Sequence, residues 1–264
     1  NEDDDESTCG TYSAPSGNSV GWVWNAGSST VTNTDGSVDS EVRANTTTGF
    51  SIVKWTAPNP QDNSVTIAHG LTQKPDFWIV KSTTRSANWI VYTQQLDGSL
   101  DFGLLNTTGA FANSSATSPT ATTFGVYGDD INYAGETQIA YCWSEVEGYS
   151  KFGSYEGNGD PDGPYVHLGF RPAIIITKSS ALGTWIIRDT ARDTFNSETS
   201  AKLAPNYSYE ENNSSYIGLS SQTLVDFLSN GFKVRSTGGI SNDNGVTYIY
   251  AAFAESPFKY SNAR

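Results

Sequence analysis

Short segments rich in Val, Ile, Thr, Trp and Tyr recur along this chain, separated by stretches of Gly, Pro, Asn and Asp. This pattern is typical of β-strands joined by turns. Thr137, Ile139, Tyr141 and Trp143 occupy alternate positions and so share one face of a strand. Residues 77–80 are apolar throughout, which indicates burial on both faces. No long segment repeats its apolar residues with the period of an α-helix. We therefore predict an all-β fold.

The predicted strands form two series. The first comprises residues 49–56, 64–69, 76–82, 87–93, 100–106, 122–128 and 137–145. The second comprises residues 151–156, 164–169, 173–179, 184–190, 201–205, 224–228, 231–236 and 247–255. Asn230-Gly231, between Phe227 and Phe232, predicts a hairpin turn, because Asn and Gly accept the positive φ that such turns require.

The two series have similar sequences. Residues 74–82 (KPDFWIVKS) correspond to 171–179 (RPAIIITKS), and 137–145 (TQIAYCWSE) correspond to 247–255 (TYIYAAFAE). The corresponding segments lie about 100 residues apart, the size of one small domain. We expect two tandem homologous β-sandwich repeats, at residues 49–148 and 149–260, or one larger sandwich built from both. Residues common to both repeats are expected to be scaffold, and features of one repeat are candidates for function.

The two ends of the chain do not fit either repeat. Residues 1–48 are interpreted as an acidic linker that includes the last strand of a preceding, truncated unit, and residues 261–264 as a tail. The supposed strand is Val20–Trp24, which resembles Ile139–Trp143, while residues 26–48 are expected only to connect it to the first repeat.

The formal charge of the chain is −13, with 15 Lys and Arg against 28 Asp and Glu. This balance argues against nucleic-acid binding and against an anionic membrane surface, since both need clustered basic residues. No apolar run reaches the roughly 20 residues that span a bilayer. The 7 Trp, 14 Tyr and 12 Phe can supply two cores.

Catalytic chemistry is not indicated by the sequence. The two histidines, His69 and His167, fall at different positions of the two repeats, and no Gly-x-Ser-x-Gly motif occurs. Glu145 and Glu255 correspond to each other, as do Lys81 and Lys178. Duplicated residues of this kind are expected to make shared structural contacts, so no catalytic residue is assigned and the chain is not expected to be an enzyme.

Three clusters of Asp, Asn and Gly, at residues 128–130, 158–163 and 242–245, could in principle bind calcium. Asp160 and Asp162 are the best metal candidates among them. The same residues are ordinary β-turn formers, and the turn interpretation is favoured. Apart from this calcium alternative, no cofactor is expected.

Aromatic residues divide into paired and unpaired positions. Trp89 corresponds to Trp185, and Trp143 to Phe253, so all four are assigned to cores. The second repeat has an insertion near residues 204–216 that is rich in Tyr, Ser and Asn, a composition found in binding loops. The residues predicted to bind a ligand there are Asn206, Tyr207, Tyr209, Asn212 and Tyr216. The alternative is a polar loop without a ligand.

Several strings are distinctive when taken together. They include residues 147–155 (EGYSKFGSY), 162–172 (DGPYVHLGFRP), 227–233 (FLSNGFK) and 248–255 (YIYAAFAE). From about residue 20 to 260 the chain resembles the repetitive C-terminal domains of tail-fibre-like and other virion structural proteins of marine tailed bacteriophages.

The resemblance implies sandwiches of the jelly-roll or lectin type on the virion surface, in an extracellular homotrimer with other virion proteins. The expected function is host-receptor recognition by a tail-fibre module, which would bind a cell-surface glycan or protein without catalysis. A carbohydrate-active depolymerase and a purely architectural virion or filament subunit are the alternatives. Neither nucleic acid nor membrane insertion is expected.

Overall fold

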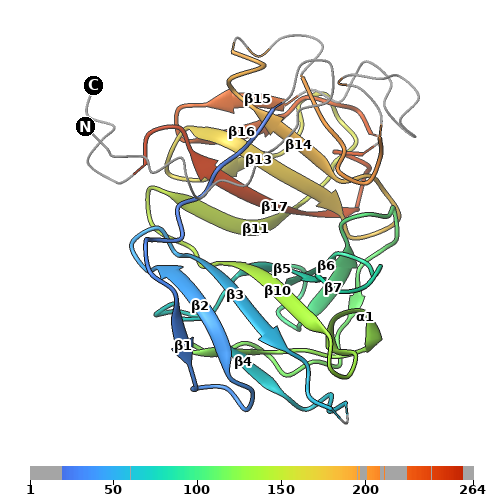
Figure 1. The fold of residues 1–264 in the computed structure, drawn as a ribbon. Coiled ribbons are helices and arrows are strands. Elements are labelled where there is room, and N and C mark those ends of the chain that lie inside the picture. Colours follow the sequence, from blue (N-terminus) through green and yellow to red (C-terminus); the bar gives the residue numbers. More distant parts are fainter. Residues whose placement is uncertain are drawn as a thin grey trace.

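The computed structural model describes residues 20–59, 61–194, 196, 201–208, 211, 225–238 and 240–257. Within these ranges the fold is nearly all-β, with antiparallel pairing within each sheet, and the all-β prediction is confirmed. The strands form two halves that are stacked on each other (Figure 1). We call β1 to β10 with α1 the first half and β11 to β17 the second half.

The first half contains a large sheet of eight strands in the order β1-β2-β3-β10-β5-β6-β7-β8 and a small sheet of two, β4-β9. A single short helix, α1, precedes β10, and none of the described helices is long or apolar enough to cross a membrane. The bounds are β1 Val31–Asn33, β2 Ser40–Asn45, β3 Phe50–Thr56, β4 Thr66–Ala68, β5 Phe77–Ser82, β6 Ile90–Thr93, β7 Asp101–Leu104, β8 Ala112–Asn113, β9 Thr123–Gly125, α1 Asp129–Asn132 and β10 Thr137–Trp143.

The second half contains a large sheet of four strands, β11-β17-β13-β14, and a small sheet of three, β12-β16-β15. Strands β15 and β16 form the hairpin predicted at Asn230-Gly231, with Leu228 paired to Gly231. The bounds are β11 Ser150–Glu156, β12 Tyr165–His167, β13 Pro172–Ser179, β14 Ile186–Asp189, β15 Val225–Leu228, β16 Gly231–Val234 and β17 Thr247–Ala254.

The strand order β3-β10-β5-β6 of the first half recurs as β11-β17-β13-β14 in the second. Loop contacts recur as well. Gly135 donates its N–H to the carbonyl of Ala57 at 3.1 Å, and Gly245 donates to Gly157 at 2.9 Å. Both donors have positive φ, 75° and 73°, which glycine adopts without strain.

Each half has its own core between its large and small sheets. In the first half Trp78, Ile67, Phe124 and Cys142 belong to this core, and all four are fully buried. In the second half Phe227, Phe232 and Tyr248 belong to the corresponding core, together with Ala252. Cys142 and Ala252, which hold the same place in the corresponding segments 137–145 and 247–255, both have no exposed surface.

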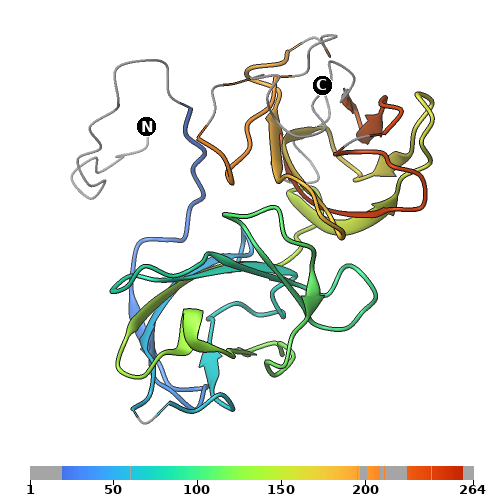
Figure 2. The same cartoon turned by 90° about the vertical axis from the view of Figure 1, so that its right-hand side faces the viewer.

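A third apolar cluster, which we call the interface cluster, lies where the two large sheets face each other. It contains buried residues of both halves, namely Ala26, Phe50, Phe77, Val91, Trp143, Phe152, Trp185, Ile249, Ala251 and Phe253. Along β17 the side chains of Tyr248, Tyr250 and Ala252 enter the core of the second half, and those between them enter the interface cluster. The layers therefore run small sheet, large sheet, large sheet, small sheet (Figures 1 and 2).

The expectation for residues 20–48 is wrong in two respects. Val20–Trp24 form no strand; Trp24 instead packs its ring against Trp143 and Phe253, with centroids 5.6 and 5.2 Å apart. Residues 26–48 are more than a connection, because β1 and β2 extend the large sheet beyond β3. The inward side chain of Val42 is buried, whereas Glu41 is exposed, and such polar positions lower the mean hydropathy of this stretch. Residues 201–205, expected as a strand, contribute one bridge between Leu203 and Ile187.

The paired tryptophans have similar backbones and different surroundings. The N–H of Trp89 and that of Trp185 each donate to an asparagine side chain, Asn106 and Asn206, both at 3.1 Å. The Trp185 ring is fully buried, and its Nε1 donates to the Leu104 carbonyl of the first half at 2.8 Å. Trp89 is 37% exposed. Its assignment to a core is therefore wrong, because the first half covers the Trp185 ring, whereas the Trp89 ring stays at the surface.

This contrast gives a matched pair of variants. We expect Trp185→Ala to lower the free energy of unfolding by about 3–5 kcal/mol, because it leaves a large cavity between the halves. Trp89→Ala should cost less than about 1 kcal/mol, because its ring is partly solvated already. Urea denaturation followed by far-UV circular dichroism measures both values. Equal losses would contradict the placement of Trp185 in the interface.

Candidate functional site

Two residues of the predicted binding loop, Asn206 and Tyr207, make structural contacts. The Asn206 Oδ1 accepts the N–H of Trp185, and Tyr207 packs against Ile186 and Ile240. Asn106 holds the same place in the first half, so the asparagine belongs to the shared framework. Tyr209, Asn212 and Tyr216 lie outside the described residues. The two residues that can be placed thus support packing, and the ligand site is not built on them.

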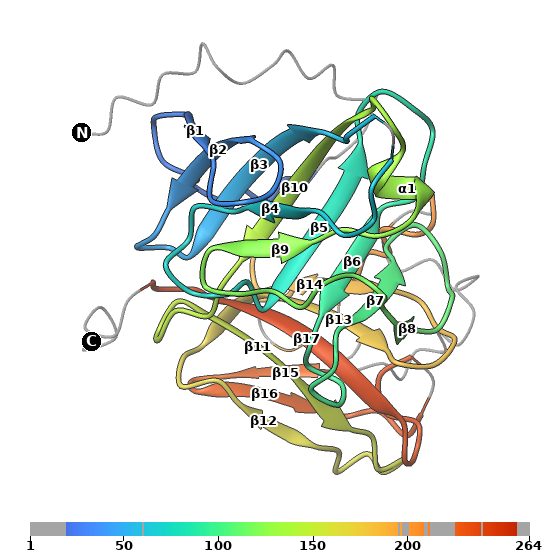
Figure 3. The same ribbon diagram turned by 90° about the horizontal axis from the view of Figure 1, so that it is seen from below.

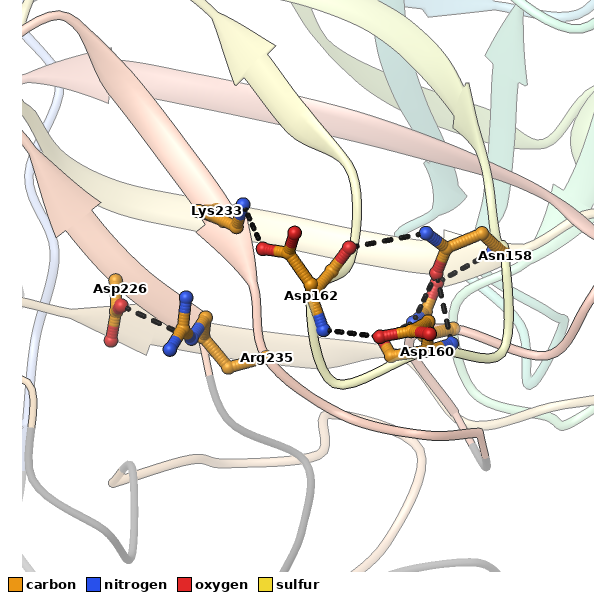
Figure 4. A network of polar contacts seen from close by, with 7 residues as sticks. Asn158, Asp160, Asp162, Asp226, Lys233 and Arg235 are labelled. Carbon is orange, nitrogen blue, oxygen red and sulfur yellow. Dashed lines mark hydrogen bonds and ion pairs between the residues drawn. The ribbon is translucent and has the colours of Figure 1, made fainter.

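The two metal candidates form a turn and an ion pair (Figure 4). Asp160 accepts the N–H of Asp162 through Oδ1 at 2.7 Å, an Asx turn. Asp162 Oδ1 lies 2.5 Å from the Lys233 Nζ, and this hydrogen bond and charge lower the pKa of Asp162. Asp162 therefore already has a cationic partner at one of its two carboxylate oxygens. Among the described residues no group of three or more His, Cys, Asp or Glu could hold a metal.

The duplicated lysines make the same structural contacts, as expected. Lys81 Nζ donates to the carbonyls of Ser82 and Arg85 at 2.8 and 3.3 Å. Lys178 Nζ donates to those of Ser179 and Ala181, both at 2.9 Å, and burial lowers its pKa to about 8. Each lysine therefore closes the turn that follows its own strand.

The remaining ionisable candidates differ in their contacts, and the expected shared contact of Glu145 and Glu255 is not found among the described residues. Buried His69 accepts the N–H of Leu71 through Nδ1 at 3.1 Å, and burial lowers its pKa. His167 is exposed and contacts the Tyr165 hydroxyl at 3.2 Å. Glu255 forms an ion pair with Arg171 at 2.8 Å. Burial raises the pKa of Glu145, which has no such partner at that distance among the described residues.

A cavity of about 580 Å³ opens beside α1 in the first half, and we call it the α1 cavity. It is lined by apolar residues of β6 and β7 and by polar residues of the surrounding loops. The lining comprises Asn63, Ile90, Tyr92, Phe102, Asn113, Ser114, Ser115, Tyr127, Gly128, Asp129 and Asp130.

The cavity exists because the two sheets of the first half differ in width. The large sheet has eight strands and the small sheet has two, so β7 and β8 extend past the strands that cover the centre (Figure 3). Loops rather than strands cover this part of the inner face. Apolar side chains that would otherwise meet a second sheet form the floor of the cavity.

The floor is firmly packed. Tyr92 of β6 pairs with Phe102 of β7 and stacks on Trp78, with ring centroids 5.2 Å apart. Burial raises the pKa of Tyr92 well above its ordinary value, and a hydrogen bond with Ser114 opposes this shift. Its hydroxyl therefore stays neutral near pH 7. A rigid floor of this kind favours binding, because little side-chain freedom is lost.

The rim carries one aromatic ring and two carboxylates. Tyr127 is 48% exposed and precedes Gly128, whose φ of 92° turns the chain into α1. Asp129 Oδ1 accepts the side-chain amide of Gln61 at 3.0 Å. Asp130 Oδ2 accepts that of Asn88 at 2.7 Å. The amides fix both carboxylates beside the exposed tyrosine.

Among the described residues of the second half, the rim has no counterpart. Phe124 pairs with Ile67 as Phe232 pairs with Val166, and three residues after each phenylalanine stand Tyr127 and Arg235. Arg235 lies 3.6 Å from Asp226 in an ion pair (Figure 4). Sequence reasoning treated residues 128–130 only as a turn or calcium cluster. The signal that could have found the site was the unpaired tyrosine beside it.

The second half holds one wall of the cavity in place. The loop between β7 and β8 donates the Phe111 N–H to the Ser180 carbonyl at 2.8 Å. It accepts the Gly183 N–H at the Thr108 carbonyl, at 2.9 Å. The Phe111 ring packs on Trp185, with centroids 5.9 Å apart. Because Asn113 follows this loop, the position of the wall depends on the contact between the halves.

Beside the floor, β7 carries a buried carboxyl that predicts a pH dependence of stability. Asp101 is 3% exposed, and burial, together with the charge of Asp97, raises its pKa to about 6. In the unfolded chain this group loses its proton near pH 4. Between about pH 4 and pH 6 the unfolded state therefore binds fewer protons, and stability falls as the pH rises.

We expect Asp101→Asn to remove this fall, because the amide stays neutral at every pH. Relative to the wild type, the variant should gain more stability at about pH 7.5 than at about pH 4. Denaturant midpoints at the two pH values measure the difference. A substitution effect that is the same at both would show that Asp101 titrates normally.

Comparison with known proteins identifies a family without an assigned activity. No curated protein and no solved structure matches the chain. The family described as a domain of unknown function, DUF7483, matches residues 3–257. This match covers both halves of the structure, and the chain belongs to the DUF7483 family.

Proposed function

We propose that this chain is a non-enzymatic glycan-recognition module of a phage virion, which binds a host-surface sugar in the α1 cavity. The single observation that carries the proposal is the exposed Tyr127 beside the fixed carboxylates of Asp129 and Asp130, above a cavity of about 580 Å³. This volume is in the range that holds a small ligand. The resemblance of the sequence to tail-fibre-like proteins supplies the biological setting.

The chemistry of the lining suits a sugar. A tyrosine ring offers a flat apolar face on which the C–H face of a pyranose packs. Carboxylate and amide oxygens accept hydrogen bonds from hydroxyls, and the amide of Asn113 and the hydroxyl of Ser115 can also donate. Asn113 and Ser115 are exposed and also line this space.

The proposal includes an evolutionary origin for the two halves of the fold. We infer that the halves are homologous tandem sandwiches and that the second has kept the scaffold without the site. The recurring strand order supports this, as do the matching contacts of Lys81 with Lys178 and of Gly135 with Gly245. In a homotrimeric fibre, three α1 cavities would act together, and multivalency would raise a weak single-site affinity.

Tyr127→Ala provides the test. We expect it to weaken binding to the preferred glycan of a bacterial-surface oligosaccharide array by about ten-fold or more, because the stacking face is lost. The free energy of unfolding should change little, since the ring is half exposed. Tyr165→Ala is the matched control, because Tyr165 is 45% exposed and lies on the second half. Its binding should stay within about two-fold of wild type.

Three results would contradict the proposal. Equal binding by the Tyr127 and Tyr165 variants would place the site elsewhere. Failure of the wild type to bind any glycan would favour the architectural alternative. Release of reducing ends from host polysaccharide would identify a depolymerase.

A further inference from the structure

We infer that the α1 cavity selects uncharged sugars and excludes those that carry a carboxylate or a phosphate. This inference deepens the proposed function and rests on it. It follows from the charges at the rim, from the place of the nearest arginine and from the apolar floor.

The rim presents negative charge to the ligand. Asp129 uses Oδ1 toward Gln61, and Asp130 uses Oδ2 toward Asn88. For the second oxygen of each carboxylate, the described residues supply no hydrogen-bond partner. Each of these oxygens can accept a sugar hydroxyl. An anionic group placed there would instead meet two like charges and no donor from either carboxylate.

The basic residue of this corner does not offset that charge inside the cavity. Arg85 places its guanidinium over the Tyr133 ring, 4.7 Å from the centroid. Its Nη1 donates to the backbone carbonyl of Asp129 at 2.9 Å. Arg85 therefore contacts the backbone of α1, and it does not belong to the described residues that line the cavity. The net charge of −13 adds a longer-range repulsion that salt screens.

The apolar floor of the cavity also disfavours a charged ligand. Phe102, which is partly buried, offers apolar surface at the base of the cavity, and buried Ile90 also lines it. A carboxylate brought against this surface would lose water without gaining a partner, which is unfavourable. The C–H face of a neutral hexose, an acetyl methyl or the methyl group of a 6-deoxy sugar would pack there favourably. The ligand class is thus an uncharged glycan with a small apolar group.

The test uses pairs of oligosaccharides that differ only in a hydroxymethyl or a carboxylate at C6 of one hexose. We expect the wild type to bind the neutral member about ten-fold more tightly or better at low salt. In the double variant Asp129→Asn with Asp130→Asn this ratio should fall to about three-fold or less, and the wild-type ratio should narrow as sodium chloride is raised. Asp35→Asn with Asp39→Asn is the control, because it changes the net charge equally at exposed positions of the β1–β2 loop.

The outcomes separate this inference from the proposed function. Preference of the wild type for the carboxylate member would overturn the charge selectivity and leave glycan binding intact. An equal fall of the ratio in the control variant would assign the effect to net charge and overturn the role of the rim. Absence of binding to both members and to the rest of the array would overturn both proposals.

Discussion

The packing of the two large sheets against each other is the constraint on which the rest of the structure depends. Strands β10 and β17 are central in their sheets and bury side chains on both faces. Trp143 and Phe253 meet at the interface, with their ring centroids 6.3 Å apart. Trp24 packs against both of these rings. Each fully buried side chain of this kind contributes roughly 1.5–3 kcal/mol. Two halves stabilised in this way are expected to unfold together rather than separately.

The same contact allows the first half to carry an open site. A sheet with eight strands under a partner with two would leave apolar surface uncovered on both faces, but the second half covers the outer face. What stays accessible is the inner floor at β6 and β7, bounded by loops. The loop that holds Phe111 is itself fixed by hydrogen bonds to the second half. The cavity therefore has a wall held in place by the second half, none of whose described residues belongs to the lining.

Much of the strand pattern could be predicted from the sequence, because turn residues and β-branched residues mark strands locally. The hairpin before Phe232 follows from such a local signal. Burial that depends on a distant partner could not be predicted. Trp89 and Trp185 occupy the same backbone setting, yet only the position of the other half decides which ring is covered. The structural contact of Asn206 could not be predicted for a related reason, because its partner is a backbone N–H that composition does not reveal.

Residues that the halves share and residues that they do not share are under different physical constraints. Asn132 and Asn242 are both fully buried, and their side-chain amides donate to the carbonyls of Asp62 and Asp160 at 2.7 and 2.9 Å. Loss of either would leave buried polar groups unpaired, so such positions cannot vary freely. Tyr127 is half exposed and contributes little to the core. The rim of the α1 cavity can therefore change its residues at small cost to folding, which is the property that the proposed recognition role would require.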